Sequence, residues 1–263
     1  MSFEFFLEPL TTLLIVSSGV LVGFSLGLIG GGGSVLAVPL LLYVVGIKDV
    51  HTSIGISSLA IGVIAAVHLL NHRKSGNLKI RKGLTFMFPG IFGTILGSTI
   101  GLWTSSENLL VLFAMFMILV GIFMLRKKET ITIHANSTLK FDFLKRNLLV
   151  SGFSVGVLAG YFGIGGGFLI IPALIYSGGL SIFQSVATSL MSVSSFGLVT
   201  ASRYLLETSV DIMMVVYFVI GGVVGGFMGL QLAKKIPQQS LMKLFAAILF
   251  IVASYVIIKT LFL

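Results

Sequence analysis

Two long runs of this chain contain no charged residue. Residues 9–47 and residues 147–202 lack Asp, Glu, Lys and Arg throughout. About 20 consecutive apolar residues are enough for one helix to cross a bilayer, so each run has room for more than one membrane segment. Only 10% of the chain is charged, whereas soluble domains carry about a quarter. The sequence therefore predicts an all-α integral membrane protein, because helices satisfy their backbone hydrogen bonds within lipid.

A cluster of glycines interrupts each charge-free run. The first cluster lies in LGLIGGGGSVLAVP, residues 26–39, and the second in AGYFGIGGGFLIIP, residues 159–172. Irregular backbone inside a membrane is tolerated only where protein buries it or where it lines a cavity. We therefore expect a glycine-broken helix at the centre of each half. The short segments that follow, residues 34–46 and 168–178, either cross fully or form re-entrant hairpins.

The two halves of the chain resemble each other well beyond the glycine clusters. The glycine ladder of residues 90–97 recurs in residues 221–229 at an offset of 132, and both ladders are typical of helix-packing faces. The further expected segments cover residues 50–72, 83–106, 108–125, 212–233 and about 240–262. We predict a first membrane repeat over residues 1–125, a basic linker over 126–146 and a second membrane repeat over 147–263. Five segments per repeat is an odd number, so the halves are expected to be inverted repeats, as in many secondary transporters.

Basic residues indicate how the chain is oriented in the membrane. Much of the net charge of +9 lies in the loop 71–82 and in the linker 126–146. Because Lys and Arg accumulate in cytoplasmic loops, we expect both to be cytoplasmic and both chain termini to lie outside. His68 and His72 are expected at the cytoplasmic boundary. This topology accounts for the positive charge without a nucleic-acid partner, and the bacterial inner membrane is the expected location.

Small hydroxyl residues open the third helix of each half, in HTSIGISSL (51–59) and QSVATSL (184–190). Hydroxyl groups, and backbone N–H groups freed by a helix break, can donate hydrogen bonds to an anion. The alternative is that these hydroxyls bond within or between helices. The residues expected to bind substrate are Gly32, Gly33, Ser34, His51, Gly55, Ser57, Ser58, Gly165, Gly166, Gly167, Gln184, Thr188 and Ser189.

No catalytic constellation is visible in the sequence. The chain has no cysteine, and its acidic residues all fall at predicted helix ends or in loops. A phosphate-binding GxxxxGK[ST] motif and a zinc-binding HExxH motif are both absent. The sequence therefore predicts no enzyme, no metal site and no cofactor.

The chain resembles the TauE/SafE family of sulfite and organosulfonate exporters over essentially its whole length. The resemblance is carried by GLIGGGGSVLAVPLLL and SIGISSL in the first half, and by GYFGIGGGFLIIPALI and VATSL in the second. The family commonly has a GTSL-like stretch where this chain has Gly55-Ile56-Ser57-Ser58, so the threonine is retained only as Thr188. The resemblance implies a multi-spanning permease that moves sulfite, sulfoacetate or related anions, usually outward.

The favoured hypothesis is a secondary transporter that exports small sulfur-containing oxyanions such as sulfite or organosulfonates. Alternating access is expected from one repeat rocking against the other. An anion channel, or a permease subunit for a different small substrate, stays open as an alternative. The expected partners are a small anionic substrate and the lipid bilayer, with a second copy of the chain in a homodimer as an open possibility.

Overall fold

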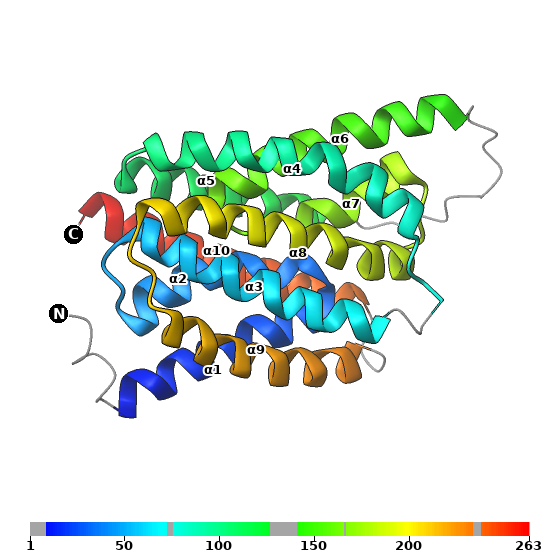
Figure 1. Ribbon diagram of the computed structural model, residues 1–263. Helices are drawn as coiled ribbons and strands as arrows, with labels where there is room; N and C mark the ends of the chain where they lie inside the picture. The colour runs from blue at the N-terminus through cyan, green and yellow to red at the C-terminus, as the bar shows by residue number, and fades with distance from the viewer. Residues whose placement is uncertain (1–8, 73–75, 127–140, 166, 234–237, 263) are drawn as a thin grey trace.

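Helices make up nearly all of the described chain, and the described residues contain no strand. The computed structural model describes residues 9–72, 76–126, 141–165, 167–233 and 238–262 (Figure 1). The first half comprises α1 (Pro9–Ile29), η2 (Gly31–Leu36), α2 (Ala37–Leu40), η3 (Leu41–Val45), α3 (Val50–His72), α4 (Ile80–Trp103) and α5 (Ser106–Arg126). The second comprises α6 (Phe141–Phe162), α7 (Gly167–Gly178), α8 (Ile182–Glu207), α9 (Ile212–Ala233) and α10 (Gln238–Phe262). The predicted all-α class is confirmed.

Within the described residues, five helices are long and apolar enough to cross a membrane. They are α1, α3, α4, α8 and α9, and shorter apolar stretches lie in α5, α6, α7 and α10. Many large apolar side chains face outward, among them Phe88, Leu119 and Ile251, which are 67%, 62% and 69% exposed. Such a surface suits lipid rather than water, so the integral membrane prediction is confirmed.

The segments after the two glycine breaks are too short to cross a bilayer. α7 has 12 residues, which is about 18 Å of helix against a hydrocarbon core of about 30 Å. The corresponding first-half segment changes from 3₁₀ to α to π geometry between Gly31 and Val45. Figure 1 shows that α1 and α3 begin at one end of the bundle, whereas α6 and α8 begin at the other. Each long helix and its short partner therefore form a hairpin.

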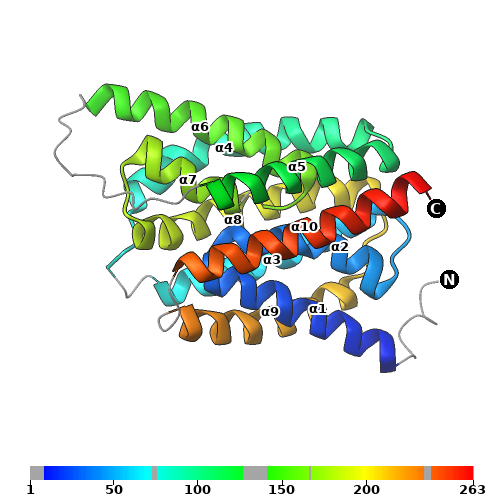
Figure 2. The same ribbon diagram turned by 180° about the vertical axis from the view of Figure 1, so that it is seen from behind.

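Glycine faces join helices of one half to helices of the other. Methyl groups added at Gly23 of α1 would overlap the carbonyl oxygen of Gly222 in α9. In the same way, methyl groups at Gly156 of α6 would overlap the carbonyl oxygen of Gly90 in α4. Backbones approach this closely only where side chains are absent, so the glycine ladders are confirmed as packing faces. The pairs α1/α9 and α4/α6 lie on opposite sides of the central helices α3 and α8 (Figures 1 and 2).

Equivalent helices of the two halves run in opposite directions through the bundle. In Figure 1, α1 and α3 run from left to right, whereas α6 and α8 run from right to left. The helix ends that lead into the basic loop and linker, the end of α3 and the start of α6, share the right-hand end. The inverted orientation across a bilayer and the repeat boundaries stay predictions.

Candidate functional site

Both glycine breaks are built on a backbone conformation that favours glycine. Gly30 follows α1 with φ +72°, and Gly163 follows α6 with φ +65°. A residue with a Cβ atom is strained in this region, so glycine is needed at both positions. The helix ends there and the chain turns into the short segment of the hairpin. The two breaks occupy equivalent positions in the halves.

Each break faces the central helix of the opposite half, α8 for Gly30 and α3 for Gly163. A methyl group at Gly30 would lie 3.1 Å from the nearest methyl carbon of Val186 in α8. A methyl group at Gly163 would overlap the side chain of Ile54 in α3. Ser58 also donates a hydrogen bond of 2.8 Å to the carbonyl oxygen of Gly163. Its equivalent in the other half is Leu190, which has no hydroxyl to donate. The second break is therefore held more tightly than the first.

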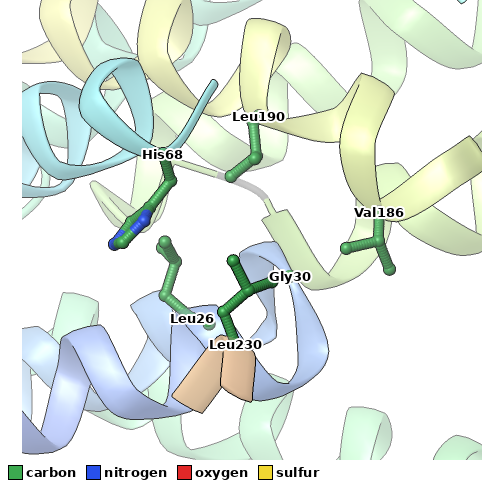
Figure 3. Close-up of a pocket in the computed structure, with 7 residues that line it drawn as sticks. Leu26, Gly30, His68, Val186, Leu190 and Leu230 are labelled. Atoms are coloured by element: carbon green, nitrogen blue, oxygen red, sulfur yellow. The ribbon is translucent and has the colours of Figure 1, made fainter. Parts of the chain in front are cut away.

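A small cavity adjoins the looser break. It is formed where α1, α3, α8 and α9 meet, and helices of both halves contribute to it (Figure 3). The residues that line it are Leu26, Gly27, Gly30, His68, Val186, Leu190 and Leu230. Its free space accommodates roughly one water molecule. The cavity is therefore too small for a molecule much larger than water.

His68 is buried beside this cavity, with only 3% of its surface exposed. Its ring lies edge-on to Phe227, with centroids 5.3 Å apart. A methyl group at Gly226 would overlap Nε2 of the imidazole, so the absence of a side chain there makes room for the ring. α9 and α1 cover this part of α3, and the expectation that His68 lies at the cytoplasmic boundary stays a prediction.

The paired serines of α3 and α8 bond within their own helices in this structure. Ser57 donates to the carbonyl oxygen of Ile54 at 3.1 Å, and Ser189 donates to that of Val186 at 2.8 Å. Both are fully buried. Their acceptors belong to the residues that face the two breaks.

Thr188 lies on a different face of α8 from the cavity. Its Oγ1 accepts a hydrogen bond of 3.1 Å from the backbone N–H of Lys79, just before α4. A methyl group at Gly83 would lie 2.9 Å from the Thr188 methyl carbon. The structure thus uses Thr188 to position the start of α4, while Val186 and Leu190 line the cavity.

His51 and Gly55 lie toward the other end of α3, about 25 Å and about 20 Å along the helix from His68. The His51 ring stacks on Tyr204, with centroids 5.9 Å apart and planes 27° from parallel. A methyl group at Gly55 would lie 2.9 Å from a methyl carbon of Val210. The Tyr204 hydroxyl and His51 Nδ1 are buried and have no hydrogen-bond partner among the described residues. The residues predicted as one site are therefore divided between two ends of the bundle.

Gln184 and Asp49 serve as helix caps. Gln184 and Ser181 form a reciprocal capping box at the start of α8, at 3.3 and 3.4 Å. Asp49 precedes α3 and accepts hydrogen bonds from the backbone N–H and the hydroxyl of Thr52, at 2.7 and 2.6 Å. Burial alone raises the pKa of Asp49, but the Thr52 bonds and nearby His51 outweigh it, so this pKa lies below its ordinary value. Both caps fix where a central helix begins.

The remaining predicted residues belong to the breaks themselves. Gly32, Gly33 and Ser34 lie in η2, and a methyl group at Gly33 would overlap the backbone of Leu26. Gly165 has φ +61° and lies between Ile61 of α3 and Val193 of α8. A methyl group added at Gly165 would lie 3.4 Å from a methyl carbon of each. Gly167 begins α7, and Gly166 lies outside the described residues.

None of the seven residues that line the cavity is among those that the sequence predicts to bind substrate. The internal repeat gives no signal for Leu190 and Leu230, because their equivalents are Ser58 and Ser98. His68 does carry a signal, since it is an ionisable residue inside a long apolar helix.

The comparisons with known proteins decide the family. The profile described as "Sulfite exporter TauE/SafE" matches residues 15–256. The chain belongs to the TauE/SafE family. A "Probable membrane transporter protein" of Xylella fastidiosa is 39% identical over 249 residues, which are 93% of this chain and 94% of that protein. YunE of Bacillus subtilis, described in the same words, is 24% identical over 95% of this chain and 98% of its own length. No solved structure matches the chain.

Proposed function

We propose that the chain is a secondary transporter that exports small sulfur-containing oxyanions, either sulfite or organosulfonates. The family description supports the substrate class, and the relatives' names support membrane transport. The observation that carries the proposal is the pair of equivalent helix breaks, one of which borders a cavity built by both halves. Transport needs no covalent chemistry from the protein, and we assign the chain no enzymatic role.

The anion would bind at the Gly30 break, between the end of α1 and residues 186–190 of α8. Backbone N–H groups freed by the break are partial positive charges that favour an anion. Serine hydroxyls of α3 and α8 add neutral donors once they rotate away from their own helices. Neutral donors suit a transporter, because they hold an oxyanion without the full attraction of a fixed charge, and release remains possible.

Alternating access follows from the unequal closure of the two breaks. The Gly163 break is sealed by Ile54 and Ser58, whereas the Gly30 break keeps a small cavity. If the halves are inverted repeats, the Gly163 break could adopt the looser packing while the Gly30 break adopts the tighter one. That exchange would open the anion site to the opposite side of the membrane. The motion that we favour differs from rocking of one repeat against the other, because α9 packs closely on α1 and α6 on α4, so that each pair joins the two halves. We propose that these mixed pairs move as units around α3 and α8.

The direction of transport that we propose follows from the membrane potential and from the position of the basic residues. The helix ends next to the basic loop and linker share one end of the bundle, and we assign that end to the cytoplasm of a bacterial inner membrane. Both chain termini would then lie outside. An inside-negative potential favours outward movement of an anion by about 2.3 kcal/mol per charge per 100 mV.

The test is uptake and counterflow in proteoliposomes, preceded by thermal-shift measurements with sulfite, sulfoacetate, acetate and chloride. A ligand that binds only the folded protein raises its stability by RT ln(1 + [L]/Kd). We expect a shift with the sulfur oxyanions, and saturable counterflow of the same anions. Flux that does not saturate and shows no counterflow would identify an anion channel instead. A response to none of the sulfur oxyanions would contradict the proposed substrate class.

A matched pair of substitutions locates the transport path. Leu190→Phe fills the cavity and should abolish uptake, because Leu190 is 2% exposed and lines it. Leu198→Phe on the same helix is the control, since Leu198 is 43% exposed and is absent from the cavity lining. Equal uptake by the two variants would place the path elsewhere.

A further inference from the structure

The place beside the second break that is equivalent to the cavity has hydroxyl groups where the cavity has Leu and His. The offset of 132 residues that relates the two glycine ladders also relates α3 to α8. At that offset, the equivalents of the lining residues Leu190, Leu230 and His68 are Ser58, Ser98 and Thr200. All three hydroxyl residues are fully buried. The second break is therefore the more polar of the two.

Contacts between the helices place these three residues near the second break. Ser58 donates its hydrogen bond to the carbonyl oxygen at the break itself. A methyl group at Gly160, one turn before the break, would lie 2.9 Å from the backbone nitrogen of Ser98. A methyl group at Gly197 would lie 2.8 Å from the carbonyl oxygen of Ser58, and Thr200 follows one turn later on that face of α8. Hydroxyls of α3, α4 and α8 thus meet near the end of α6.

Two buried hydroxyl groups at this place have no hydrogen-bond partner among the described residues. They are Oγ1 of Thr200 and the phenol oxygen of Tyr204, one turn apart on α8. Both side chains are fully buried. A methyl group at Gly101 of α4 would lie 2.7 Å from the Tyr204 oxygen and 2.8 Å from the carbonyl oxygen of Tyr161, just before the break. Buried hydroxyls are normally hydrogen-bonded, so these two donors indicate an acceptor that binds there.

An oxyanion is an acceptor that suits several neutral donors at once. We propose that the second break is a second anion-binding site, where the hydroxyls of Ser58, Ser98 and Thr200 hold a sulfur oxyanion once this break adopts the looser packing. The inference rests on the proposed function and adds a site for the same class of anion. Ser58 would exchange its bond to the Gly163 carbonyl for one to the anion, and backbone N–H groups freed by the break would add further donors.

The two anion sites lie at different depths in the bundle. About 20 Å of α3 separates Ile54, which contacts the second break, from His68, which lines the cavity. Ile54 lies near the start of α3, away from the basic loop that follows its end. An exported anion would therefore occupy the cavity at the first break before it reaches the hydroxyl site at the second.

Substitutions at Thr200 test this site, because they remove or keep the hydroxyl with little change in shape. The measurement is the Kd for ethanesulfonate, by calorimetric titration of the purified full chain. A hydrogen bond to a charged group changes affinity by about tenfold or more, so we expect that loss in Thr200→Val. Thr200→Ser keeps the hydroxyl and should bind like wild type. Ser202→Ala is the control, because Ser202 is exposed on the same helix and donates to the carbonyl oxygen of Val199.

Two further variants separate the second site from the first. Leu190→Phe fills the cavity at the first break and should still bind ethanesulfonate, whereas adding Thr200→Val to it should weaken that binding about tenfold or more. Ser98→Ala should weaken binding in the same way, and it tests the site even if Thr200→Val does not fold. The Ser98 hydroxyl bonds only within α4 in this structure, so its loss leaves the packing between helices in place.

The outcomes distinguish this inference from the transport proposal. Unchanged affinity in both Thr200→Val and Ser98→Ala, or equal losses in Thr200→Val and Thr200→Ser, overturns the second site and leaves the transport proposal standing. Complete loss of binding in folded Leu190→Phe has the same meaning. Failure of wild type to bind any of sulfite, sulfoacetate and ethanesulfonate rejects the proposed function, and this inference with it.

Discussion

Ser58 holds the second glycine break with a single hydrogen bond. Its hydroxyl and the Gly163 carbonyl are 105 residues apart in the sequence and 2.8 Å apart in space. Ser58→Ala would leave a buried carbonyl unpaired, which costs about 1–3 kcal/mol. We expect a lower midpoint in thermal unfolding of the detergent-solubilised protein. Ser57→Ala is the matched control, because the Ser57 hydroxyl bonds only within α3, and a larger loss from that variant would contradict the assigned role.

Asp49 makes the start of α3 sensitive to acid. Its pKa is lowered in the folded protein from an ordinary value of 3.8. The stabilisation is therefore present above pH 3.8 and is lost as the pH falls through the lower, folded-state value. Asp49→Ala removes the cap and should cost about 1 kcal/mol at neutral pH.

The measurement is thermal unfolding of wild type and Asp49→Ala at neutral pH and at a pH below the folded-state pKa of Asp49. The difference between the two proteins should shrink in acid, because wild type then loses the same interaction. A difference that does not change with pH would show that the carboxylate charge is not what stabilises the helix start.

Among the helices, the glycine faces set the tightest packing. Gly23→Ala inserts a methyl group into the Gly222 carbonyl, so α1 and α9 must separate. Overpacking of this kind usually costs about 1–3 kcal/mol. Leu21→Ala, at a position 55% exposed on the same helix, is the control. Comparable unfolding midpoints for the two variants would refute the tight α1/α9 contact.

The sequence predicts the membrane helices and the helix breaks well, because each has a distinctive amino-acid composition. Absent charges locate the membrane helices, and glycine clusters locate the breaks. Helix boundaries shift by a few residues, since α4 begins at Ile80 rather than 83 and α6 at Phe141 rather than 147.

The site is predicted less well. Thr188 and Gln184 have the chemistry of ligand contacts, yet Thr188 accepts a hydrogen bond from the backbone before α4 and Gln184 caps α8. Nothing in the local sequence distinguishes these uses.

At the scale of the whole molecule, the two halves depend on each other. The glycine face of α1 is covered by α9, and that of α6 by α4, so neither half covers its own faces. We expect residues 1–133 or 134–263 expressed alone to be degraded, and co-expression of the two fragments to restore a folded protein. Detergent extraction followed by size-exclusion chromatography checks this. A stable, monodisperse single half would contradict the mutual dependence.

This interleaving also sets an order of events during synthesis. α6 begins at Phe141, soon after α4 ends at Trp103, whereas α9 begins at Ile212, roughly 180 residues after α1 ends at Ile29. At about 5–20 residues per second, α1 waits roughly 10–40 s for its partner, while α4 waits only a few seconds. The α4/α6 contact is therefore expected to assemble first and the α1/α9 contact last. During that interval α1 is in the membrane without α9, so its glycine face is not yet packed against a helix. The insertion machinery or lipid must cover that face until α9 is made.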